Sequence, residues 1–331
     1  MVADSTEGGL GAAAQAHARW FAQRGWSVAL AAPGAGAAVV APAVAVQTPV
    51  PGGAFDVPGM LAAVAALRRL LRECRPSVVH AHGTRSQLLC LLAGRVPYVT
   101  MHGAGRVEGQ ARVGTALRVA ARRVAPALAR AAYSASPAVG WRTLLHASPR
   151  LAELNRLPAP MGTPTFLWLG RLDAPKRPDV FIDALALLAR PVRGLVVGDG
   201  PLRAEAEARA ERLGLEVDFL GHRSDLSDHL SRAFAVCLFS DFEGVPFSVQ
   251  EAMWSGRAVV LSDLPSLRWF AGGHASFARD AVEAAGAMQQ LCVDAVAGRE
   301  GDDAARHARS LLSEDAPFPQ LLADYGHRPV T

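Results

Sequence analysis

This chain has almost no lysine: Lys176 is the only one among its 34 basic residues. The other basic residues are arginines, in a chain rich in alanine and glycine, which indicates a compositional bias against lysine. One lysine kept against that bias points to a chemical role. The alternative is an ordinary lysine on a solvated loop.

Aromatic residues are also scarce, at 6% of the chain, so few rings are available to stack on nucleic-acid bases. The net charge of +4 is modest for a nucleic-acid-binding protein but suits an anionic ligand. No run reaches the about 18 apolar residues of a membrane span. The cysteines are far apart, with no CxxC pair and no zinc-type Cys/His spacing. We therefore expect a cytoplasmic protein that has no metal ligands and binds no nucleic acid.

What the chain does have is a regular alternation of short apolar runs and helix-length segments over 331 residues. This pattern predicts α/β structure with parallel sheets, and the length favours two domains. In the first half we predict strands at 27–31, 43–47, 77–81, 98–101 and 131–134, and helices at 10–24, 58–73, 86–92 and 110–130. In the second half we predict strands at 165–169, 194–198, 216–220, 233–239, 258–262 and 275–278, and helices at 178–189, 201–213, 226–232, 248–255 and 281–297.

The domain boundary is marked by prolines at positions 149, 158, 160 and 164, in a stretch with little periodicity. We predict a doubly wound N-terminal domain at 1–150 and a linker at 151–164. A second doubly wound, ligand-binding domain is predicted at 165–315. A tail at 316–331 is expected to pack back on the N-terminal domain.

The N-terminus is unusual, because only a few residues precede the Gly8-Gly9 loop. A doubly wound domain needs a buried strand at this point. Either that strand is very short, or the true start of the protein lies upstream of Met1. We expect the second, since loss of a central strand would leave its neighbours as unpaired edges. The glycine pair opens onto a helix, a geometry that tolerates phosphate.

Lys176 itself closes the segment GRLDAPK (170–176), directly after the apolar run 166–169. This places Arg171 and Lys176 on a loop at the C-terminal end of a predicted strand. Ligands bind at such strand ends in open α/β sheets. Arginine offers a fork for phosphate oxygens and lysine a compact charge.

The strongest signal is the segment SDFEGVPFSVQEAM (240–253), in which seven residues separate Glu243 from Glu251. Gly244 relaxes the loop, and Ser248 is expected to cap the next helix. The first helical turn exposes an anion-binding set of backbone N–H groups, those of Phe247, Ser248 and Val249. Glu251 can accept two hydroxyls of a ribose or a hexose. The alternative is that Glu243 is an ordinary helix cap and Glu251 an ordinary residue on the helix surface.

Two further turns are less specific. The segment GDGP (198–201) follows a buried run, and its glycines allow close backbone approach, as in many strand–helix turns. The turn at His222 and Arg223 is placed to contact a nucleobase. It is equally well explained as a turn capped by Ser224 or Asp225.

Histidines stand at two predicted strand ends, His80 and His82 in the first and His102 in the second. At a strand's C-terminal end, His102 is expected to face the ligand cleft, to donate to a sugar hydroxyl and to titrate near neutral pH. The alternative is a structural histidine.

The predicted helix 110–130 has an apolar stripe and an arginine-rich face formed by Arg112, Arg118, Arg122 and Arg123. Such a face can contact an anionic membrane surface or an anionic acceptor. An ordinary solvated helix face is the alternative.

In combination, these motifs resemble the GT4 family of retaining glycosyltransferases, also called group 1, which have the GT-B fold. Four motifs occur in the family's order: GRL-x3-K (170–176), GDGP (198–201), LGHRSDL (220–226) and E-x7-E (243–251). The first half matches more loosely, through the GG loop, VVHAHG (78–83) and VTMHG (99–103). Two departures are the short first strand and Arg177, where the family usually has glycine. The resemblance implies two Rossmann-like domains that face each other across a cleft.

The resemblance also implies roles for individual residues. Arg171 and Lys176 would hold the donor diphosphate, Glu243 the transferred sugar and Glu251 the ribose. His102 would contact the donor sugar near its reacting carbon, so that Arg171, Lys176, Glu243 and His102 form the catalytic set. The remaining donor-site positions would be Gly9, Gly170, Gly198, His222, Arg223, Gly244, Phe247, Ser248 and Val249.

The function implied is transfer of a hexosyl unit from a nucleoside diphosphate sugar to an acceptor hydroxyl, with retained anomeric configuration. The nucleotide base stays open among UDP, GDP and ADP, and the acceptor among sugars, lipid-linked sugars and natural products. No cofactor and no metal are expected, because the sequence has no D-x-D carboxylate pair. One alternative is a nucleoside diphosphate sugar 2-epimerase of the same architecture. The other is a degenerate sugar-nucleotide-binding subunit.

Overall fold

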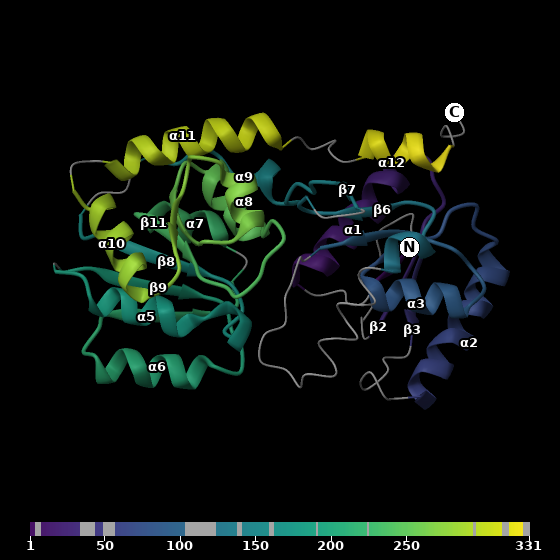
Figure 1. Cartoon of the computed structure of the whole chain (residues 1–331), viewed down its shortest axis with the longest axis horizontal. Coiled ribbons are helices and arrows are strands. Elements are labelled where there is room, and N and C mark those ends of the chain that lie inside the picture. Colours follow the sequence, from purple (N-terminus) through teal and green to yellow (C-terminus); the bar gives the residue numbers. More distant parts are fainter. Residues whose placement is uncertain are drawn as a thin grey trace. The chain divides into compact units, whose positions relative to one another are not determined.

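The computed structural model of the protein consists of two compact units (Figure 1). Unit 1 holds the described residues up to Pro149 together with the C-terminal helix, and unit 2 runs from Arg150 to the end of the preceding helix. The residues that the structure describes are 1–3, 8–33, 44–48, 57–102, 124–137, 141–158, 162–189, 191–223, 225–293, 296–312 and 318–326.

Unit 1 is built on a seven-stranded parallel sheet of order β3-β2-β1-β4-β5-β6-β7. Its strands are β1 (Val2–Ala3), β2 (Ala29–Pro33), β3 (Val44–Thr48), β4 (His80–His82), β5 (Tyr98–Met101), β6 (Ala132–Ser134) and β7 (Arg142–Thr143). Its helices are α1 (Gly8–Gln23), α2 (Val57–Cys74), α3 (Thr84–Leu92), the 3-10 turn η1 (Ala125–Leu128) and α12 (Phe318–Tyr325). The chain first winds from β1 toward β3 and then from β4 toward β7, as in a doubly wound sheet.

The first strand is very short but sits at the centre of this sheet. Val2 is paired with Ala31 on β2 and with Ala81 on β4. Both residues of β1 are buried. Strand β1 thus joins the two halves of the sheet.

Helix α12 returns from the end of unit 2 to pack on unit 1. The hydroxyl of Tyr98 donates to the Asp324 carbonyl oxygen at 2.8 Å, and that of Tyr133 donates to Asp324 Oδ2 at 2.6 Å. The ring of Phe318 stacks on Trp20 of α1, with centroids 4.4 Å apart. Polar and aromatic contacts together attach the helix to the sheet and to α1.

Unit 2 has a six-stranded parallel sheet of order β10-β9-β8-β11-β12-β13. The strands are β8 (Thr165–Leu169), β9 (Arg193–Val197), β10 (Val217–Gly221), β11 (Ala235–Leu238), β12 (Ala258–Ser262) and β13 (Ser276–Ala278). The helices are η2 (Leu151–Glu153), η3 (Ala174–Lys176), α5 (Pro178–Ala186), α6 (Arg203–Arg212), α7 (Leu226–Arg232), α8 (Phe247–Trp254), α9 (Pro265–Ala271), α10 (Ala281–Leu291) and α11 (Val296–Leu311). Figure 1 shows α6 alongside α5, and α11 alongside α8 and α9.

The core of unit 2 explains why its strands read as continuous apolar runs. All four residues from Phe166 to Leu169 are buried, because helices cover both faces of the sheet. Trp168 lies against Phe181 of α5, with ring centroids 5.7 Å apart. This packing gives the loops at the strand ends a rigid support.

Most predicted elements are present, and the predicted bounds of β5, β8, β12 and α7 are correct. The prediction of a single helix at 281–297 is wrong, because α10 ends at Leu291 and a separate helix α11 begins at Val296. The predictions also lacked β7, α9 and α12. Each of these elements is short.

Most of the predicted basic helix, residues 110–123, lies outside the described residues, so membrane contact there stays a prediction. The part that is described contains only η1, around Pro126. In the described part of the chain, no helix is both long enough and apolar enough to cross a membrane.

Candidate functional site

Three loops meet at the C-terminal edge of the unit 2 sheet, where they follow β8, β9 and β11. Parallel strands present their C-terminal ends at one edge, so the predicted motifs are brought together there. The Asp241 N–H donates to the Pro175 carbonyl at 2.9 Å, which joins the loop after β11 to the loop that carries Lys176.

The first two loops are packed backbone against backbone. The N–H of Leu172 donates to the Asp199 carbonyl at 3.0 Å. Gly198 has φ 144°, and a Cβ built there would lie 1.8 Å from the Gly170 carbonyl oxygen. At Gly200 a Cβ would lie 2.3 Å from the Leu172 oxygen. Only glycine fits this packing, so GRL and GDGP form a single structural unit.

The central feature of this edge is an ion pair between Lys176 and Glu243, in which the lysine Nζ donates to Oε1. Ser240 also donates to this oxygen, at 2.8 Å, and Ser266 Oγ donates to the Glu243 carbonyl at 2.8 Å. The side chains are 26% and 10% exposed. This burial and the additional hydrogen bonds distinguish the pair from a surface ion pair. A cation and a carboxylate are thus held together where a ligand would bind.

Helix α8 begins directly after this loop, and its first turn carries the predicted N–H groups of Phe247, Ser248 and Val249. The prediction that Ser248 caps the helix is wrong. The N-cap is Pro246, whose fixed backbone angle starts the helix without any side-chain hydrogen bond. Glu251 lies on the same helix and is 6% exposed, which excludes an ordinary surface residue.

Two arginines lie on the same loop as Lys176, and their side chains and backbones are held differently. Arg171 is 71% exposed and lies 3.2 Å from Asp173, so it can reorient toward a ligand. Arg177 has left-handed backbone angles, φ 48° and ψ 55°, at the position where the family usually has glycine. Ion pairs with Asp179 at 3.1 Å and with Asp241 at 3.4 Å accompany this conformation. The loop thus keeps a glycine-type shape with a non-glycine residue.

The predicted base-contacting turn follows β10, the edge strand of the sheet. His222 and Arg223 are both exposed, and Arg223 pairs with Asp225 at 2.9 Å. Asp225 is the N-cap residue of α7 but makes no side-chain capping bond, and Ser224 is outside the described residues. Among the described residues, no hydrogen bond or ion pair joins His222 or Arg223 to Lys176 or Glu243. Gly221, which precedes them, accepts from the Gly198 N–H at 2.8 Å and so places the turn beside GDGP.

In unit 1, Gly9 lies in the first turn of α1, and a Cβ there would have no atom within 4 Å. His102 directly follows β5, and its Nε2 lies 2.8 Å from Nδ1 of His82. Burial, together with nearby His146 and His80, holds the pKa of His102 well below its usual range. The prediction that His102 titrates near neutral pH is therefore wrong, and its imidazole is neutral.

Some site residues were missed from the sequence. Ser240 and Ser266 orient Glu243, and Arg177 contacts Asp241 of the same loop. Ser240 opens the segment SDFEGVPFSVQEAM (240–253), which is the one sequence signal that pointed to it. Ser266 comes from α9, an element that the sequence did not predict.

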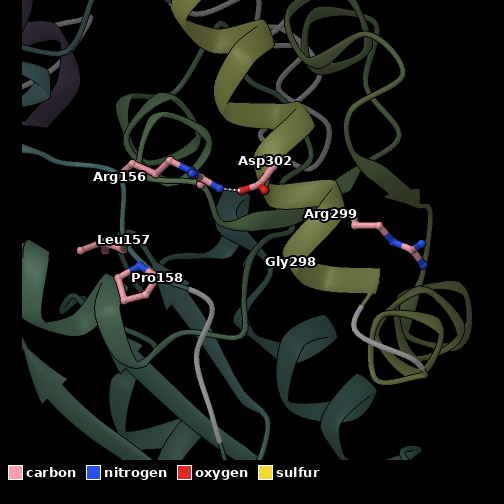
Figure 2. Close-up of a pocket in the computed structure, with 7 residues that line it drawn as sticks. Arg156, Leu157, Pro158, Gly298, Arg299 and Asp302 are labelled. Atoms are coloured by element: carbon pink, nitrogen blue, oxygen red, sulfur yellow. Dashed lines mark hydrogen bonds and ion pairs between the residues drawn. The ribbon is translucent and has the colours of Figure 1, made fainter.

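A cavity of about 410 Å³ lies elsewhere in unit 2, between the segment at Arg156 and helix α11 (Figure 2). Its wall includes Gly256, which precedes β12, so it lies at the sheet edge opposite to Lys176. Arg156 donates to Asp302, while Figure 2 shows the Arg299 side chain extending away from this pair. None of the predicted site residues lines it.

Comparison with known families and proteins agrees with these motifs. Residues 7–141 match the model of glycosyltransferase family 4, and residues 163–294 match that of glycosyl transferases group 1. A Campylobacter jejuni α-1,4-N-acetyl-D-galactosaminyltransferase, named for a diNAcBac-PP-undecaprenol glycan substrate, is 36% identical over 92 residues. That match covers 27% of this chain and 26% of the relative. Across the curated relatives reported, matches cover 16 to 31% of the relative's length.

Solved structures resemble the chain over almost its whole length. Sucrose-phosphate synthase from Thermosynechococcus elongatus has a TM-score of 0.81 at 19% identity, covering 98% of this chain and 94% of that one. The Anabaena protein HepE, solved with UDP-glucose, has a TM-score of 0.75 at 18% identity, covering 98% and 97%. These likenesses show the GT-B fold. With family models matching both halves in order, the chain belongs to the group 1, or GT4, family of glycosyltransferases.

Proposed function

We propose that this protein is a retaining glycosyltransferase that moves a hexosyl unit from a nucleoside diphosphate sugar to an acceptor hydroxyl. The observation that carries this proposal is the pairing of Lys176 with Glu243 next to the first turn of α8. The ion pair and the first turn of α8 place a cation, a carboxylate and backbone N–H groups together at the C-terminal edge of the unit 2 sheet. A diphosphate needs the first two, and a sugar's hydroxyls need the third.

The proposed chemistry is electrostatic. Cleavage of the sugar C1–O bond leaves negative charge on the diphosphate, and groups placed in advance around it lower the barrier. Lys176, Arg171 and the first N–H groups of α8 supply this stabilisation in the proposal. We therefore expect activity without a divalent metal. The acceptor hydroxyl would attack on the face from which the diphosphate leaves, and a phosphate oxygen would take its proton.

The remaining roles are proposed for residues on α8, after β10 and in unit 1. Glu251 is proposed to bind the ribose, and its burial on α8 supports a fixed orientation. The turn at His222 and Arg223 is proposed to receive the base. In unit 1, His102 is proposed to contact the donor sugar as a neutral hydrogen-bonding group, and Gly9 to lie near phosphate. UDP is the first nucleotide to test, because the similar Anabaena structure holds UDP-glucose.

The proposal is tested by following donor turnover in EDTA with UDP-glucose and UDP-N-acetylglucosamine, using simple glycosides and lipid-linked sugars as acceptors. UDP release that requires an acceptor, with an α-linked product seen by NMR, supports retaining transfer. Isomerisation of the donor sugar without an acceptor would indicate an epimerase instead. Nucleotide binding with no turnover on any acceptor would indicate a degenerate binding subunit.

A further inference from the structure

Five of the chain's ten histidines lie together inside unit 1. His17 on α1 has its ring centroid 4.9 Å from that of His82 on β4 and 4.5 Å from that of His146. The rings of His80 and His82 are 4.9 Å apart, and His102 lies 5.1 Å from His82. We call these residues the histidine cluster.

Three members of the histidine cluster point ligand atoms at one another. One ring nitrogen each from His17, His80 and His82 lie within 4.8 Å of one another. The three side chains are 0%, 1% and 0% exposed. Two imidazole nitrogens bound to one tetrahedral Zn²⁺ ion lie about 3.4 Å apart, because each Zn–N bond is about 2.0–2.1 Å long. Ring rotations together with side-chain shifts of about 1 Å would bring these nitrogens around a single ion.

The same residues carry buried nitrogens that lack hydrogen-bond partners. Both ring nitrogens of His17, and Nε2 of His82, have no partner among the described residues. A buried polar atom without a partner is unfavourable, and such atoms in native structures call for an explanation. Their convergence on one point favours a shared ligand that accepts nitrogen lone pairs.

We propose that the histidine cluster binds one divalent first-row transition ion through His17, His80 and His82. All three rings are buried, and burial favours the neutral imidazole that binds a metal ion. Imidazole nitrogen suits zinc, copper and nickel, whereas magnesium and calcium prefer oxygen ligands. Three histidines leave a fourth position for water.

Two of the three histidines, His82 and His80, have contacts like those of histidine metal ligands, whose second nitrogen normally donates to a neighbour. Nδ1 of His82 lies 2.8 Å from Nε2 of His102, which leaves Nε2 of His82 for the ion. His80 contacts the Tyr325 hydroxyl at 2.5 Å through Nδ1 and Thr100 Oγ1 at 2.7 Å through Nε2. It would exchange one of these hydrogen bonds for the metal and keep the other.

This inference is argued from residues of unit 1, whereas the Lys176–Glu243 pair belongs to unit 2. One member of the histidine cluster, His102, is also a proposed contact of the donor sugar, so a change in turnover could come from either proposal. The test of the metal site therefore measures metal content, which does not depend on donor turnover.

The experiment uses untagged full-length protein, stripped with a chelator and titrated with Zn²⁺ and, separately, with Co²⁺. We expect one equivalent per chain, and visible Co²⁺ bands of tetrahedral intensity that Zn²⁺ removes. His17→Leu should abolish both signals, because leucine fills the buried position without a ligand nitrogen. His102→Ala should weaken binding by about 10- to 100-fold, as for other partners of metal ligands.

The control is His229→Leu, which removes a buried histidine of unit 2 outside the histidine cluster. It should bind metal like the wild type. Folding of every variant is checked by circular dichroism. The proposal is overturned if folded wild-type protein takes up no stoichiometric metal, or if His17→Leu, or His17→Gln where leucine fails to fold, binds as tightly as wild type.

Discussion

Lys176 donates to Glu243 across 67 residues of sequence, and Ser240 donates to the same carboxylate oxygen. In the proposed reaction the diphosphate takes Lys176 and the sugar hydroxyls take Glu243. In this proposal, donor binding replaces one internal ion pair with two contacts to the ligand. Neither buried charge is then left without a partner.

Replacing Glu243 should affect turnover far more than nucleotide binding. In Glu243→Ala, the loss of a charged hydrogen bond to the sugar should lower kcat by about 10- to 100-fold. UDP affinity should stay equal or rise, because Lys176 is released to bind phosphate. Steady-state kinetics and calorimetry measure the two effects. Glu216→Ala, which removes an exposed carboxylate paired with Arg193, is the control. An equal loss of turnover and UDP binding would make Glu243 structural.

The packing of GDGP against GRL predicts a large stability effect at Gly198. Gly198→Ala would place a methyl group 1.8 Å from a backbone oxygen and should lower the free energy of unfolding by more than about 2 kcal/mol. Gly214→Ala is matched, since φ is also positive, at 65°, but no atom lies within 4 Å. It should cost only about 1 kcal/mol. Urea unfolding compares them, and equal losses would contradict the packing argument.

Arg177 offers a test of backbone strain in the lysine loop. Arg177→Gly and Arg177→Ala both remove the ion pairs with Asp179 and Asp241. They differ in the left-handed backbone, which glycine adopts freely and alanine does not. The free energy of unfolding of the glycine variant should therefore be about 1 kcal/mol higher than that of the alanine variant. Equal stability would show that the loop relaxes.

The histidine cluster predicts acid sensitivity in metal-free protein. Burial lowers the pKa of His80 from 6.5 to about 3, and that of His146 to about 4. Folded-state pKa values below the unfolded ones give stability that is complete above pH 6.5 and is lost as pH falls toward 4. Each histidine should cost about 1 kcal/mol between about pH 6.5 and 5.5.

Urea unfolding of chelator-treated protein at several pH values checks this slope. His17→Leu should flatten it, because one buried neutral histidine is removed and its neighbours lose a competing ring. A stability that does not change between about pH 7 and 5 would contradict the burial argument.

The sequence was most informative where apolar periodicity and glycine turns coincide. The strands around GRL and GDGP were predictable because buried parallel strands are continuous apolar runs. The E-x7-E segment located Glu243 and Glu251, since its loop and helix are adjacent in sequence. These features are local, and local patterns are what a sequence displays.

What the sequence did not reveal depends on contacts between distant segments. Ser266 reaches Glu243 from α9, and His17 approaches His80 and His82 from a separate helix. Neutral His102 was also unpredictable, because its pKa is set by burial and by the surrounding histidines. Such properties arise from tertiary packing and have no signal at one position.

The most direct test of the account is calorimetric titration of the protein with UDP, GDP and ADP in EDTA, for wild type, Lys176→Ala and Arg193→Ala. Arg193 is an exposed cation at the start of β9, on the sheet edge opposite to Lys176. The account predicts that wild type and Arg193→Ala bind one nucleotide alike, and that Lys176→Ala binds it about 10- to 100-fold more weakly. Absence of binding to folded wild-type protein, or an unchanged affinity in Lys176→Ala, would contradict it.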